Sequence, residues 1–382
     1  MSAPDDSTRG VSVAVIGNPA SDKGRGAAID VQVVDLLREA GRRYGFAVSD
    51  LTGTSFDDSL SNAIHARDDY DHLVVVGGDG MIALGANAVA SSGKPLGIVA
   101  IGSGNDFARG LGLPVNRVQV AVEGIVGAIV RGSHIDVDMG RITRLTDCDT
   151  VDHDTDHAVD RAAAVVSDAS PRYYAGMLSC GVDAAINDRA NHSRLPGGSL
   201  RYAAAAVAEL SHLSSYGYHV RATLPDGRIW EQDLVTPLLT VANARYIGGG
   251  IEVSPYSLFD DGLLDLVWAR RVPNLLECAA LMRNAYNGRL LSSDVLGWRR
   301  IRAIEITRSD EGDEPPTLMA DGEYVGALAV RVDAMGRSLR VLVPPAVARD
   351  QSWRSERGVI EAIRRDGRLD DADDAADAES AA

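Results

Sequence analysis

The chain has 382 residues, of which 45% are hydrophobic, and its 38 basic and 54 acidic residues give a formal net charge of −16. This length exceeds one typical domain of about 100–200 residues, so we expect two domains. The acidic balance argues against a nucleic-acid-binding protein, and no apolar run reaches the ~18 residues of a membrane-spanning helix. Three distant cysteines favour neither a disulfide framework nor a zinc site. Because the first residues lack a basic and apolar leader, we expect a cytoplasmic protein.

The negative charge is concentrated in two segments. Residues 145–170 hold seven Asp against one Arg, and residues 366–382 hold six Asp and one Glu against one Arg. Both segments are poor in large apolar side chains, as is typical of chain that forms no packed core. The sequence therefore predicts an acidic insertion at 145–170 and a disordered acidic tail at 366–382.

Residues 10–130 alternate short apolar runs with longer helical patterns, which predicts an α/β domain with a parallel sheet and crossover helices. The expected strands are Val11–Ile16, Phe46–Leu51, Asp71–Val76 and Leu96–Ala100, and the expected helices are Ala27–Tyr44, Asp57–Arg67 and Ile82–Ser91. Glycine-containing turns follow the first, third and fourth strands, at the edge where open α/β sheets bind ligands.

Residues 131–342 carry shorter alternating segments, which predicts a mostly antiparallel β-sandwich domain. The expected strands are Tyr173–Ser179, His219–Leu224, Leu234–Ala242, Gly262–Ala269 and Ile301–Thr307, and the expected helices are Ser199–Leu213 and Pro273–Arg283. The pattern then predicts a closing strand at Leu339–Val343 and a helix at Arg354–Arg365. We expect this last part of the chain, residues 343–365 after the β-rich domain, to return to the first domain.

Two neighbouring turns carry the strongest chemical signal. Gly77-Gly78-Asp79-Gly80 combines glycines, which expose backbone N–H groups to an anion, with a carboxylate that suits a metal ion beside phosphates. A tight strand-to-helix turn with an Asp cap is the alternative interpretation. Gly102-Ser103-Gly104-Asn105-Asp106 repeats the pattern after the next strand, and the two turns together predict a nucleotide pocket. No Walker sequence or ordered Gly-x-Gly-x-x-Gly is present, which argues against ordinary NTPases and dehydrogenases.

Together with four further motifs, these turns resemble the diacylglycerol kinase and sphingosine kinase superfamily of lipid kinases, in particular its soluble bacterial diacylglycerol kinase-like branch. The resemblance spans about residues 11–345. The motifs are Asn18–Ser21, Gly77–Gly80, Gly97–Leu113, Gly248–Gly250, Asp260–Asp265 and Asp321–Glu323.

The resemblance implies a kinase that holds ATP and Mg²⁺ between the two domains. It implies a nucleotide site made of Asn18, Pro19, Ala20, Ser21, Asp22, Thr54 (or Thr52), Gly77, Gly78, Asp79, Gly80, Ser103, Gly104 and Asn105. Asp79 and Asp106 would hold the catalytic Mg²⁺, Glu323 would be the general base with Asp321 beside it in the catalytic group, and Asp261 would hold a second, structural Mg²⁺. Phosphoryl transfer needs these parts because the enzyme mainly positions groups and neutralises charge.

The sequence departs from the family pattern at three positions. Met81 replaces a usual Thr after Gly80, Ser103 replaces a usual Thr, and Asp22 stands where Gly is common. The first and last changes bear on nucleotide affinity. We expect the glycine run Gly248–Gly250 to allow close backbone approach and to supply no direct chemistry.

The favoured function is an ATP- and Mg²⁺-dependent kinase for diacylglycerol or a related long-chain lipid alcohol. A NAD kinase-like enzyme, or a catalytically weak nucleotide-binding regulatory protein of the same fold, are the alternatives. We expect the lipid to be met at a membrane surface by peripheral contact, with Arg189, Arg194 and Arg201 as candidate contacts, and no nucleic-acid partner. A homodimer is compatible with the sequence.

Overall fold

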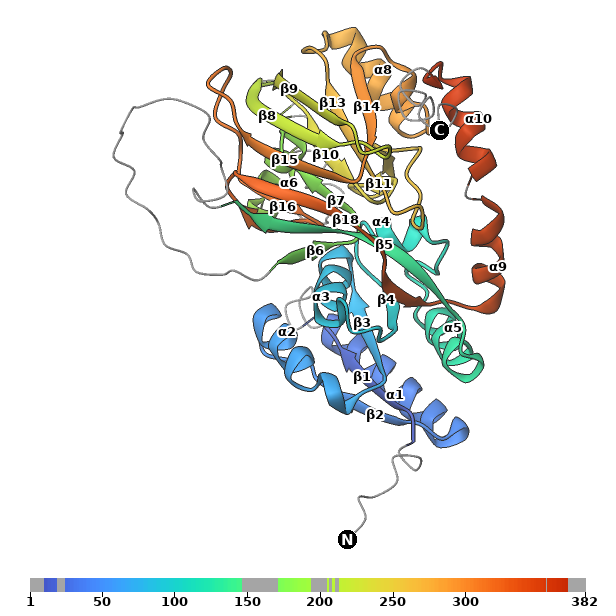
Figure 1. The fold of residues 1–382 in the computed structure, drawn as a ribbon. Coiled ribbons are helices and arrows are strands. Elements are labelled where there is room, and N and C mark those ends of the chain that lie inside the picture. Colours follow the sequence, from blue (N-terminus) through green and yellow to red (C-terminus); the bar gives the residue numbers. More distant parts are fainter. Residues whose placement is uncertain are drawn as a thin grey trace.

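The computed structural model describes residues 10–18, 25–145, 171–193, 205, 208, 209, 213–354 and 356–369. The four loop residues Pro19–Asp22 and most of the acidic insertion, the acidic tail and the expected helix Ser199–Leu213 lie outside this part of the chain. In Figure 1 the N-terminal α/β part lies at one end of the molecule and the β-rich part at the other.

The N-terminal part is built on four parallel strands in the order β2-β1-β3-β4. The strands are β1 (Ser12–Ile16), β2 (Ala47–Asp50), β3 (His72–Gly77) and β4 (Leu96–Ala100), and the helices are α1 (Arg25–Tyr44), α2 (Phe56–His65), the 3₁₀ turn η3 (Arg67–Asp69), α3 (Asp79–Val89), α4 (Asp106–Gly110) and α5 (Val118–Arg131). A helix precedes each of β2, β3 and β4 and crosses over the sheet, as parallel pairing requires.

Alternate side chains of the strands enter two different cores, because successive strand residues point to opposite faces. Val13 and Val15 of β1 pack with residues of α1 and α5. Ala14 and Ile16 belong to the other core, which contains much of α3. Both faces are covered, which explains why the strands read as uninterrupted apolar runs.

The β-rich part is a sandwich of two antiparallel sheets. One layer is the antiparallel part of a ten-stranded sheet that continues into β1–β4; its strands are β5 (His134–Arg144), β6 (Arg172–Tyr174), β8 (Tyr216–Thr223), β9 (Ile229–Thr236), β15 (Ala303–Arg308) and β18 (Val330–Leu342). The other has the order β14 (Leu296–Ile301), β13 (Leu264–Ala269), β10 (Leu239–Ala242), β7 (Met177–Ser179), β16 (Leu318–Ala320) and β17 (Glu323–Gly326). Buried residues of both sheets, such as Val220 and Leu266, share one core, as in packed sheet pairs.

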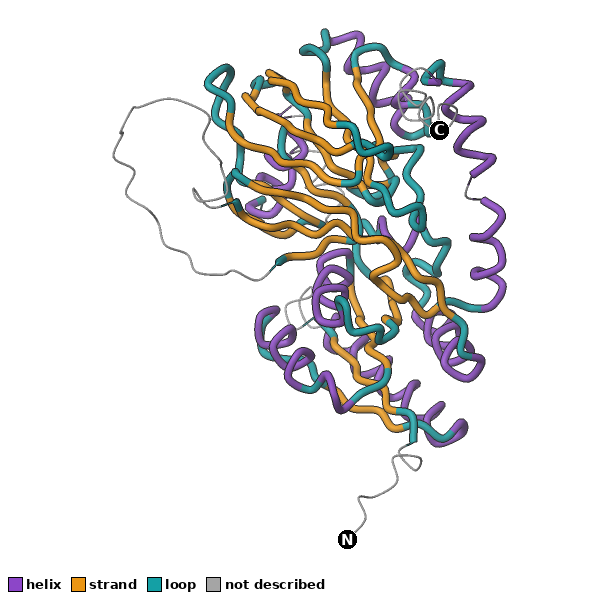
Figure 2. The backbone as a smooth tube through the Cα atoms, viewed as in Figure 1, coloured by secondary structure: helices purple, strands orange, loops and turns teal. Residues whose placement is uncertain are grey.

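Among the described residues after β5, four helices, a short hairpin and one 3₁₀ turn lie outside these two sheets. They are α6 (Val182–His192), α8 (Leu275–Ala285), η4 (Leu290–Ser292), α9 (Pro345–Arg354), α10 (Glu356–Arg365) and the hairpin of β11 (Tyr246–Ile247) and β12 (Ile251–Glu252). Figure 2 shows helices around the N-terminal sheet and mainly stacked strands in the β-rich part. No helix in the described residues is long and apolar enough to span a membrane.

Strand β18 connects the two parts of the molecule. It pairs antiparallel with β15 through its N-terminal part and with β5 along most of its length, and Val341 pairs parallel with Leu96 of β4. The closing strand therefore returns to the first sheet. The helix that directly follows, α9 (Pro345–Arg354), also contacts the first part, because Val347 and Ala348 pack against the core that contains α3. The expected helix Arg354–Arg365 corresponds to α10 (Glu356–Arg365), which does not return, because Val359 and Ile363 pack in a core of the β-rich part.

The fold class is confirmed: a parallel α/β part precedes an antiparallel β-sandwich. Two predicted strands were wrong in detail. The segment Tyr173–Ser179 divides into β6 and β7, and Leu234–Ala242 divides into β9 and β10, and in both cases the two strands belong to different sheets. The chain crosses between the sheets at Gly176 and Pro237, although the apolar pattern continues through both points.

Candidate active site

Two glycine turns lie in backbone contact at the carboxyl ends of β3 and β4. A Cβ atom on Gly102 would lie only 2.4 Å from the Cα of Gly78, so a side chain there would push the turns apart. Gly77 has φ +154° and would meet Met81 Cγ at 2.5 Å if it carried a Cβ. Glycine is therefore required where these turns approach each other.

Asn105 holds the second turn together. Its backbone is left-handed, with φ +56°, and its side chain is fully buried. The amide accepts a hydrogen bond from the Gly102 N–H at 2.7 Å and donates one to the Gly102 carbonyl at 2.6 Å. Because both bonds lie within the turn, the Asn105 side chain fixes the shape of this part of the predicted nucleotide site.

The turns bring two carboxylates together, Asp79 and Asp106, which we call the cleft pair. A Cβ atom on Gly104 would lie 2.8 Å from Asp79 Oδ2 and 3.2 Å from Asp106 Oδ2, so both carboxylates flank the same glycine. The Phe107 N–H donates to Asp79 Oδ1 at 3.3 Å, and the Gly249 N–H donates to Asp106 Oδ2 at 2.8 Å. Burial, together with the negative charge of Asp106, raises the pKa of Asp79 to about 7.

The cleft pair fits a magnesium ion. Asp106 Oδ1 is buried and has no hydrogen-bond partner among the described residues, and burial raises the pKa of Asp106. A nearby cation would remove both costs. No group of three or more His, Cys, Asp or Glu side chains that could hold a metal occurs in the described part of the chain. Mg²⁺ suits such a site because it is usually bound through one or two carboxylates, with water and substrate phosphates as its other ligands.

The turn between β16 and β17 faces the cleft pair. Asp321 has φ +50° and accepts hydrogen bonds from three successive backbone N–H groups, those of Ala175, Gly176 and Met177, at 2.8–3.0 Å. Burial nevertheless raises its pKa to about 6. These bonds hold the turn between β16 and β17 against the start of β7.

Glu323 lies directly against the first glycine turn. A Cβ atom on Gly80 would come within 2.9 Å of Glu323 Oε1. Burial raises the pKa of Glu323, while the nearby Arg172 guanidinium opposes that shift. No hydrogen bond to its carboxylate occurs within the residues that the structure describes. The sequence motifs at Asp79, Asp106, Asp321 and Glu323 therefore meet in one place.

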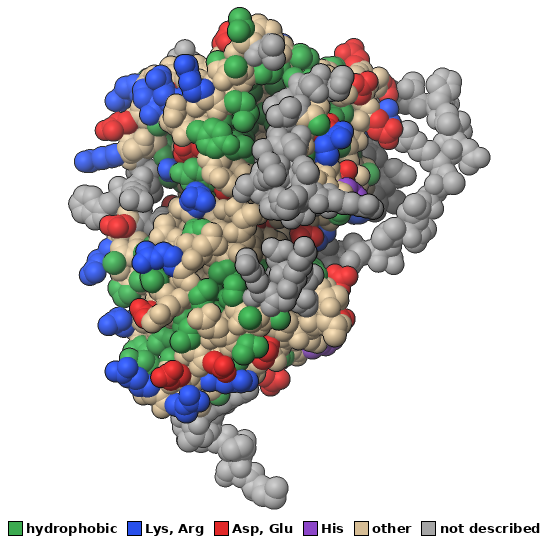
Figure 3. Space-filling model, turned by 180° about the vertical axis from the view of Figure 1, so that it is seen from behind, with side chains coloured by type: hydrophobic (Ala, Val, Ile, Leu, Met, Phe, Trp, Pro, Cys, Tyr) green, Lys and Arg blue, Asp and Glu red, His purple; other side chains and the backbone are tan. Residues whose placement is uncertain are grey.

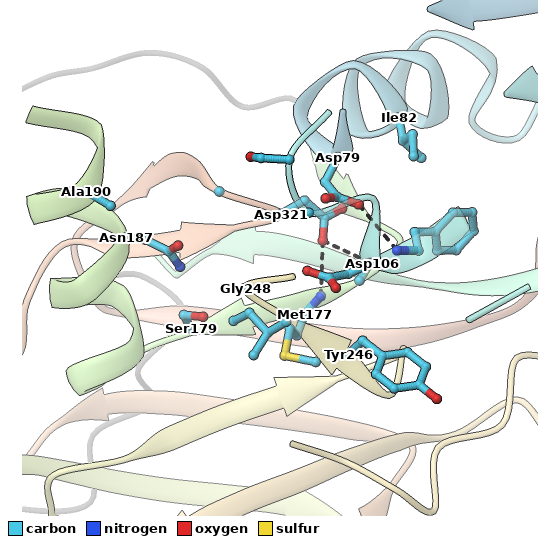
Figure 4. A pocket seen from close by; sticks show the side chains of 16 residues that line it. Asp79, Ile82, Asp106, Met177, Ser179, Asn187, Ala190, Tyr246, Gly248 and Asp321 are labelled. Atoms are coloured by element: carbon cyan, nitrogen blue, oxygen red, sulfur yellow. Dashed lines mark hydrogen bonds between the residues drawn. The ribbon is translucent and has the colours of Figure 1, made fainter. Parts of the chain in front are cut away.

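A cavity of about 240 Å³ opens beside this cluster. Figure 4 shows Asp79, Asp106 and Asp321 on one side of it, and Asn187, Ala190 and Ser179 on the other. Its lining is completed by Ile82, Ser103, Gly104, Phe107, Gly176, Met177, Tyr246, Ile247, Gly248 and Gly322. The cavity thus lies between the α/β part and the β-rich part, with the cleft pair at its wall.

The fold and these motifs agree with comparisons to known proteins. Residues 12–142 match the family model described as the diacylglycerol kinase catalytic domain, and residues 176–343 match the YegS C-terminal NAD kinase beta sandwich-like domain. The chain belongs to the diacylglycerol kinase family of lipid kinases. It carries the catalytic domain of that family and the β-sandwich that follows it.

Relatives align over nearly the whole chain. A diacylglycerol kinase of Mycobacterium tuberculosis is 28% identical over 338 residues, which cover 87% of this chain and 95% of that protein. A diacylglycerol kinase of Bacillus subtilis is 22% identical over 333 residues, 86% and 95% of the two chains. The crystal structure of a diacylglycerol kinase from Bacillus anthracis superposes with a TM-score of 0.57 at 16% identity and covers 89% of this chain and 99% of that one. The last comparison shows a shared fold.

Other predicted nucleotide contacts lie around the first strand. Asn18 lies beside Gly77, whose Cβ would be 3.8 Å from the Asn18 Cβ. The Gly17 N–H donates to Thr52 Oγ1 at 2.8 Å, which places Thr52 closer to this edge than Thr54, whose hydroxyl bonds Asp58 at the start of α2. Pro19, Ala20, Ser21 and Asp22 lie outside the described residues.

Met81 does not occupy the surface of the turn. Its side chain is 3% exposed and belongs to the core beneath α3, while its N–H bonds the Gly78 carbonyl at 3.0 Å. The change from the family's usual Thr therefore places an apolar side chain in the core and leaves the backbone of the turn in place.

Asp261 lies in a different environment from the cleft pair. We call Asp261, Asp265 and Arg300 the arginine-paired cluster, because Arg300 lies 3.7 Å from Asp261 Oδ2 and 3.9 Å from Asp265 Oδ1. Burial and the charge of Asp265 raise the pKa of Asp261 to about 7. Nearby Asp138 uses its two carboxylate oxygens for the Gly262 and Arg337 N–H groups. A second Mg²⁺ at Asp261 stays a prediction, and the guanidinium already supplies a positive charge there.

Two kinds of site residue were not predicted from the sequence. The glycine run Gly248–Gly250 makes the close backbone approach expected of it, since a Cβ on Gly249 would lie 3.8 Å from the Ser103 carbonyl oxygen. In addition, the Gly249 N–H donates to Asp106 and Gly248 lines the cavity, and neither contact was predicted. Asn187, Ser179 and Tyr246 also line the cavity. The positive φ angles of all three glycines, +64° to +109°, explain the run, but no sequence signal marks Asn187.

Proposed function

We propose that this protein transfers the γ-phosphate of ATP, in the presence of Mg²⁺, to the hydroxyl of diacylglycerol or a related long-chain lipid alcohol. One observation carries the proposal: the cleft pair and Glu323 converge on two glycine turns beside a cavity between the two parts of the chain. The names of the relatives support a lipid alcohol as the acceptor.

The glycine turns can bind phosphate groups. Helix α3 begins at Asp79, directly after Gly78, and the N–H groups at a helix N-terminus attract anions. Asp79 and Asp106 would hold Mg²⁺, which neutralises phosphate charge when bound. Asn105 keeps the second turn in shape, the Gly249 N–H holds Asp106, and the Phe107 N–H holds Asp79.

Glu323 is suited to accept the proton of the attacking hydroxyl. A carboxylate whose pKa is raised by burial is a stronger base than an exposed one. Its position against Gly80 places it beside the turn that would bind the phosphates. Asp321, which is fastened to three N–H groups, holds the Glu323 turn and does not need to contact the substrate.

Transfer of radiolabelled phosphate from ATP into an extracted lipid mixture tests the function. We expect a phosphatidic acid-type product from the intact protein and a loss of roughly 10²–10⁴-fold in Glu323→Gln, the usual contribution of a general base. Nucleotide binding, measured by calorimetry, should remain. Glu314→Gln is the matched control because this carboxylate is 80% exposed. If the intact protein labels no lipid while it binds nucleotide, the proposed acceptor is wrong.

We also propose peripheral contact with a lipid surface through α8. Leu276 is 83% exposed and Tyr286 is 63% exposed at its two ends, and Arg283 between them forms no ion pair within the described residues. Figure 3 shows basic and apolar side chains near each other at the end of the β-rich part. Arg189, considered above for this role, instead pairs with Glu209, and Arg194 and Arg201 lie outside the described residues.

Vesicle sedimentation tests this contact. Binding to vesicles that contain anionic lipid should fall severalfold when Leu276 and Tyr286 are both changed to Asp, because apolar burial and electrostatic attraction together hold such helices at a membrane. Val130→Asp provides a control, since Val130 is also exposed, at 52%, but lies on α5. Equal binding by all three proteins would remove α8 from the contact.

A further inference from the structure

The wall of the cavity opposite the cleft pair is polar and uncharged. It consists of Ser179 from β7 and of Asn187 and Ala190 from α6, and Figure 4 shows the Asn187 side chain directed from α6 toward the carboxylates. The charged residues that line the cavity are Asp79, Asp106 and Asp321, and no Lys or Arg is among the described lining residues. No basic side chain among the described lining residues would pair with an anionic head group, so the cavity suits a neutral one.

The rotation of α6 about its axis is fixed so that Asn187 faces the cavity. Asp183, at the first turn of the helix, is 7% exposed and accepts hydrogen bonds from Thr240 Oγ1 at 2.8 Å and from the Gly181 N–H at 3.1 Å. Residues 183, 187 and 190 follow the i, i+4, i+7 spacing of one helix face. The buried anchor at Asp183 therefore directs the next two residues of that face toward the cleft.

A second contact ties α6 to the turn that carries Glu323. Tyr324 Oη donates to Asp188 Oδ1 at 2.5 Å, so the helix is held on either side of Asn187. The Asn187 amide itself is half-buried and makes no hydrogen bond to any described residue. A rigidly placed amide that lacks a partner suits recognition of a ligand, because leaving its hydrogen-bonding groups unmatched disfavours ligands that cannot pair with them.

The size of the cavity limits what it can hold. About 240 Å³ is below the ~300–1,000 Å³ of a pocket for a drug-sized molecule. Two acyl chains do not fit in this volume, so it accommodates the head of a lipid alcohol and leaves the chains outside. Ala190, one turn beyond Asn187, presents a small side chain at the cavity wall.

We propose that Asn187 is a specificity-determining residue that hydrogen-bonds an ester carbonyl next to the accepting hydroxyl of an uncharged lipid alcohol. This inference rests on the proposed function. Such a hydrogen bond would select acylglycerols over plain long-chain alcohols.

The test compares two acceptors that differ only in the ester carbonyls, dioctanoylglycerol and its diether analogue, in wild type and Asn187→Leu. We expect wild type to show a KM about fivefold to tenfold lower for the ester than for the ether, which is the worth of one hydrogen bond. Asn187→Leu should lose this ratio while kcat and the KM for ATP change less than about twofold. A ratio that persists in Asn187→Leu would overturn the inference.

Two controls separate recognition from damage to the fold. His192→Ala alters the same helix at a side chain that is 74% exposed and lies 3.4 Å from Asp188. Because Tyr324 still holds Asp188 in this variant, it should keep the ester preference. Asn187→Ser retains a hydrogen-bonding group and should keep part of the preference for the ester acceptor. An equal loss in His192→Ala would assign the effect to α6 as a whole and contradict a specific role for Asn187.

A binding measurement without ATP distinguishes this inference from the proposed function. Displacement of a fluorescent short-chain diacylglycerol by the ester and the ether should show the same preference and the same sensitivity to Asn187→Leu. If the preference appears in binding but wild type transfers no phosphate, the acceptor site stands and the kinase assignment fails. If wild type binds neither acceptor, or binds both equally, the inference is wrong.

Discussion

Two groups of buried carboxylates in this protein have opposite surroundings. In the cleft pair, Asp106 Oδ1 has no hydrogen-bond partner among the described residues, and the charge of Arg109 only partly opposes the rise that burial causes in the pKa of Asp106. The arginine-paired cluster has Arg300 beside both carboxylates, and Asp265 also accepts hydrogen bonds from Trp298 Nε1 at 2.7 Å and Ser257 Oγ at 2.8 Å. Buried charge that is satisfied internally serves the fold, whereas buried charge left unsatisfied points to a ligand.

The largest effect on activity should come from the cleft pair. Asp79→Asn removes one of the two charges that would hold Mg²⁺, and we expect phosphate transfer to fall roughly 10²–10³-fold, as when an electrostatic group of a transition state is lost. The melting temperature should not fall, because the variant relieves repulsion between buried carboxylates. Lipid phosphorylation and thermal unfolding measure the two effects.

A substitution at Asp261 tests whether the arginine-paired cluster serves the fold or also binds a ligand. Asp261→Asn should keep most activity if Arg300 is its main partner. If this variant loses activity as severely as Asp79→Asn while its melting temperature stays unchanged, the arginine-paired cluster also binds a ligand and the contrast drawn here is broken.

The arginine-paired cluster should instead dominate stability. Asp265→Ala leaves Trp298 Nε1–H and the Ser257 hydroxyl without this acceptor in a buried region and removes the carboxylate 3.9 Å from Arg300 Nε, so we expect a loss of about 3 kcal/mol in the free energy of unfolding. Urea denaturation measures it. Asp260→Ala, at an exposed neighbour, should stay within about 0.5 kcal/mol. A similar small change at Asp265 would show that the cluster is not structural.

The sequence was informative about the site where residue type and local structure coincide. The glycine turns were predicted to lie together because each directly follows a buried apolar run, and parallel strands end at one edge. Pro237 could have corrected the predicted strand Leu234–Ala242, since proline interrupts central strands. The Gly249 N–H and the Asn187 amide could not be found in this way. A backbone donor leaves no trace in residue type, and an asparagine on an amphipathic helix resembles any exposed one.

A smaller effect tests how closely Glu323 must approach the first turn. In Gly80→Ala, the new Cβ would lie 2.9 Å from Glu323 Oε1 and would displace the carboxylate. We expect kcat to fall about tenfold, while stability stays the same or rises by about 0.5–1 kcal/mol through better helix propensity. Gly358→Ala on α10 is the matched control, because nothing lies within 4 Å of its added Cβ. Equal kcat values for the two variants would separate Glu323 from the turn.

The smallest effect is the pH dependence of stability without divalent metal. The pKa of Asp79 is raised from 3.8 to about 7 in the folded protein, so the folded state binds more protons than the unfolded state between about pH 4 and pH 7. Stability must then fall as pH rises through this window. Asp261 and Asp321, with pKa values raised to about 7 and about 6, contribute with the same sign. The contribution of Asp79 alone is therefore the difference between wild type and Asp79→Asn in how the free energy of unfolding changes with pH.

In EDTA, wild type should lose about 1–2 kcal/mol more than Asp79→Asn from pH 4 to pH 7, as followed by urea denaturation at each pH. Millimolar Mg²⁺ should remove this difference, because an ion bound only to the folded state stabilises it and favours the ionised carboxylate. Parallel pH profiles of the two proteins in EDTA would mean that Asp79 is already neutralised within the fold. The cleft pair would then be no more in need of a cation than the arginine-paired cluster, since internal contacts would satisfy the charge in both places.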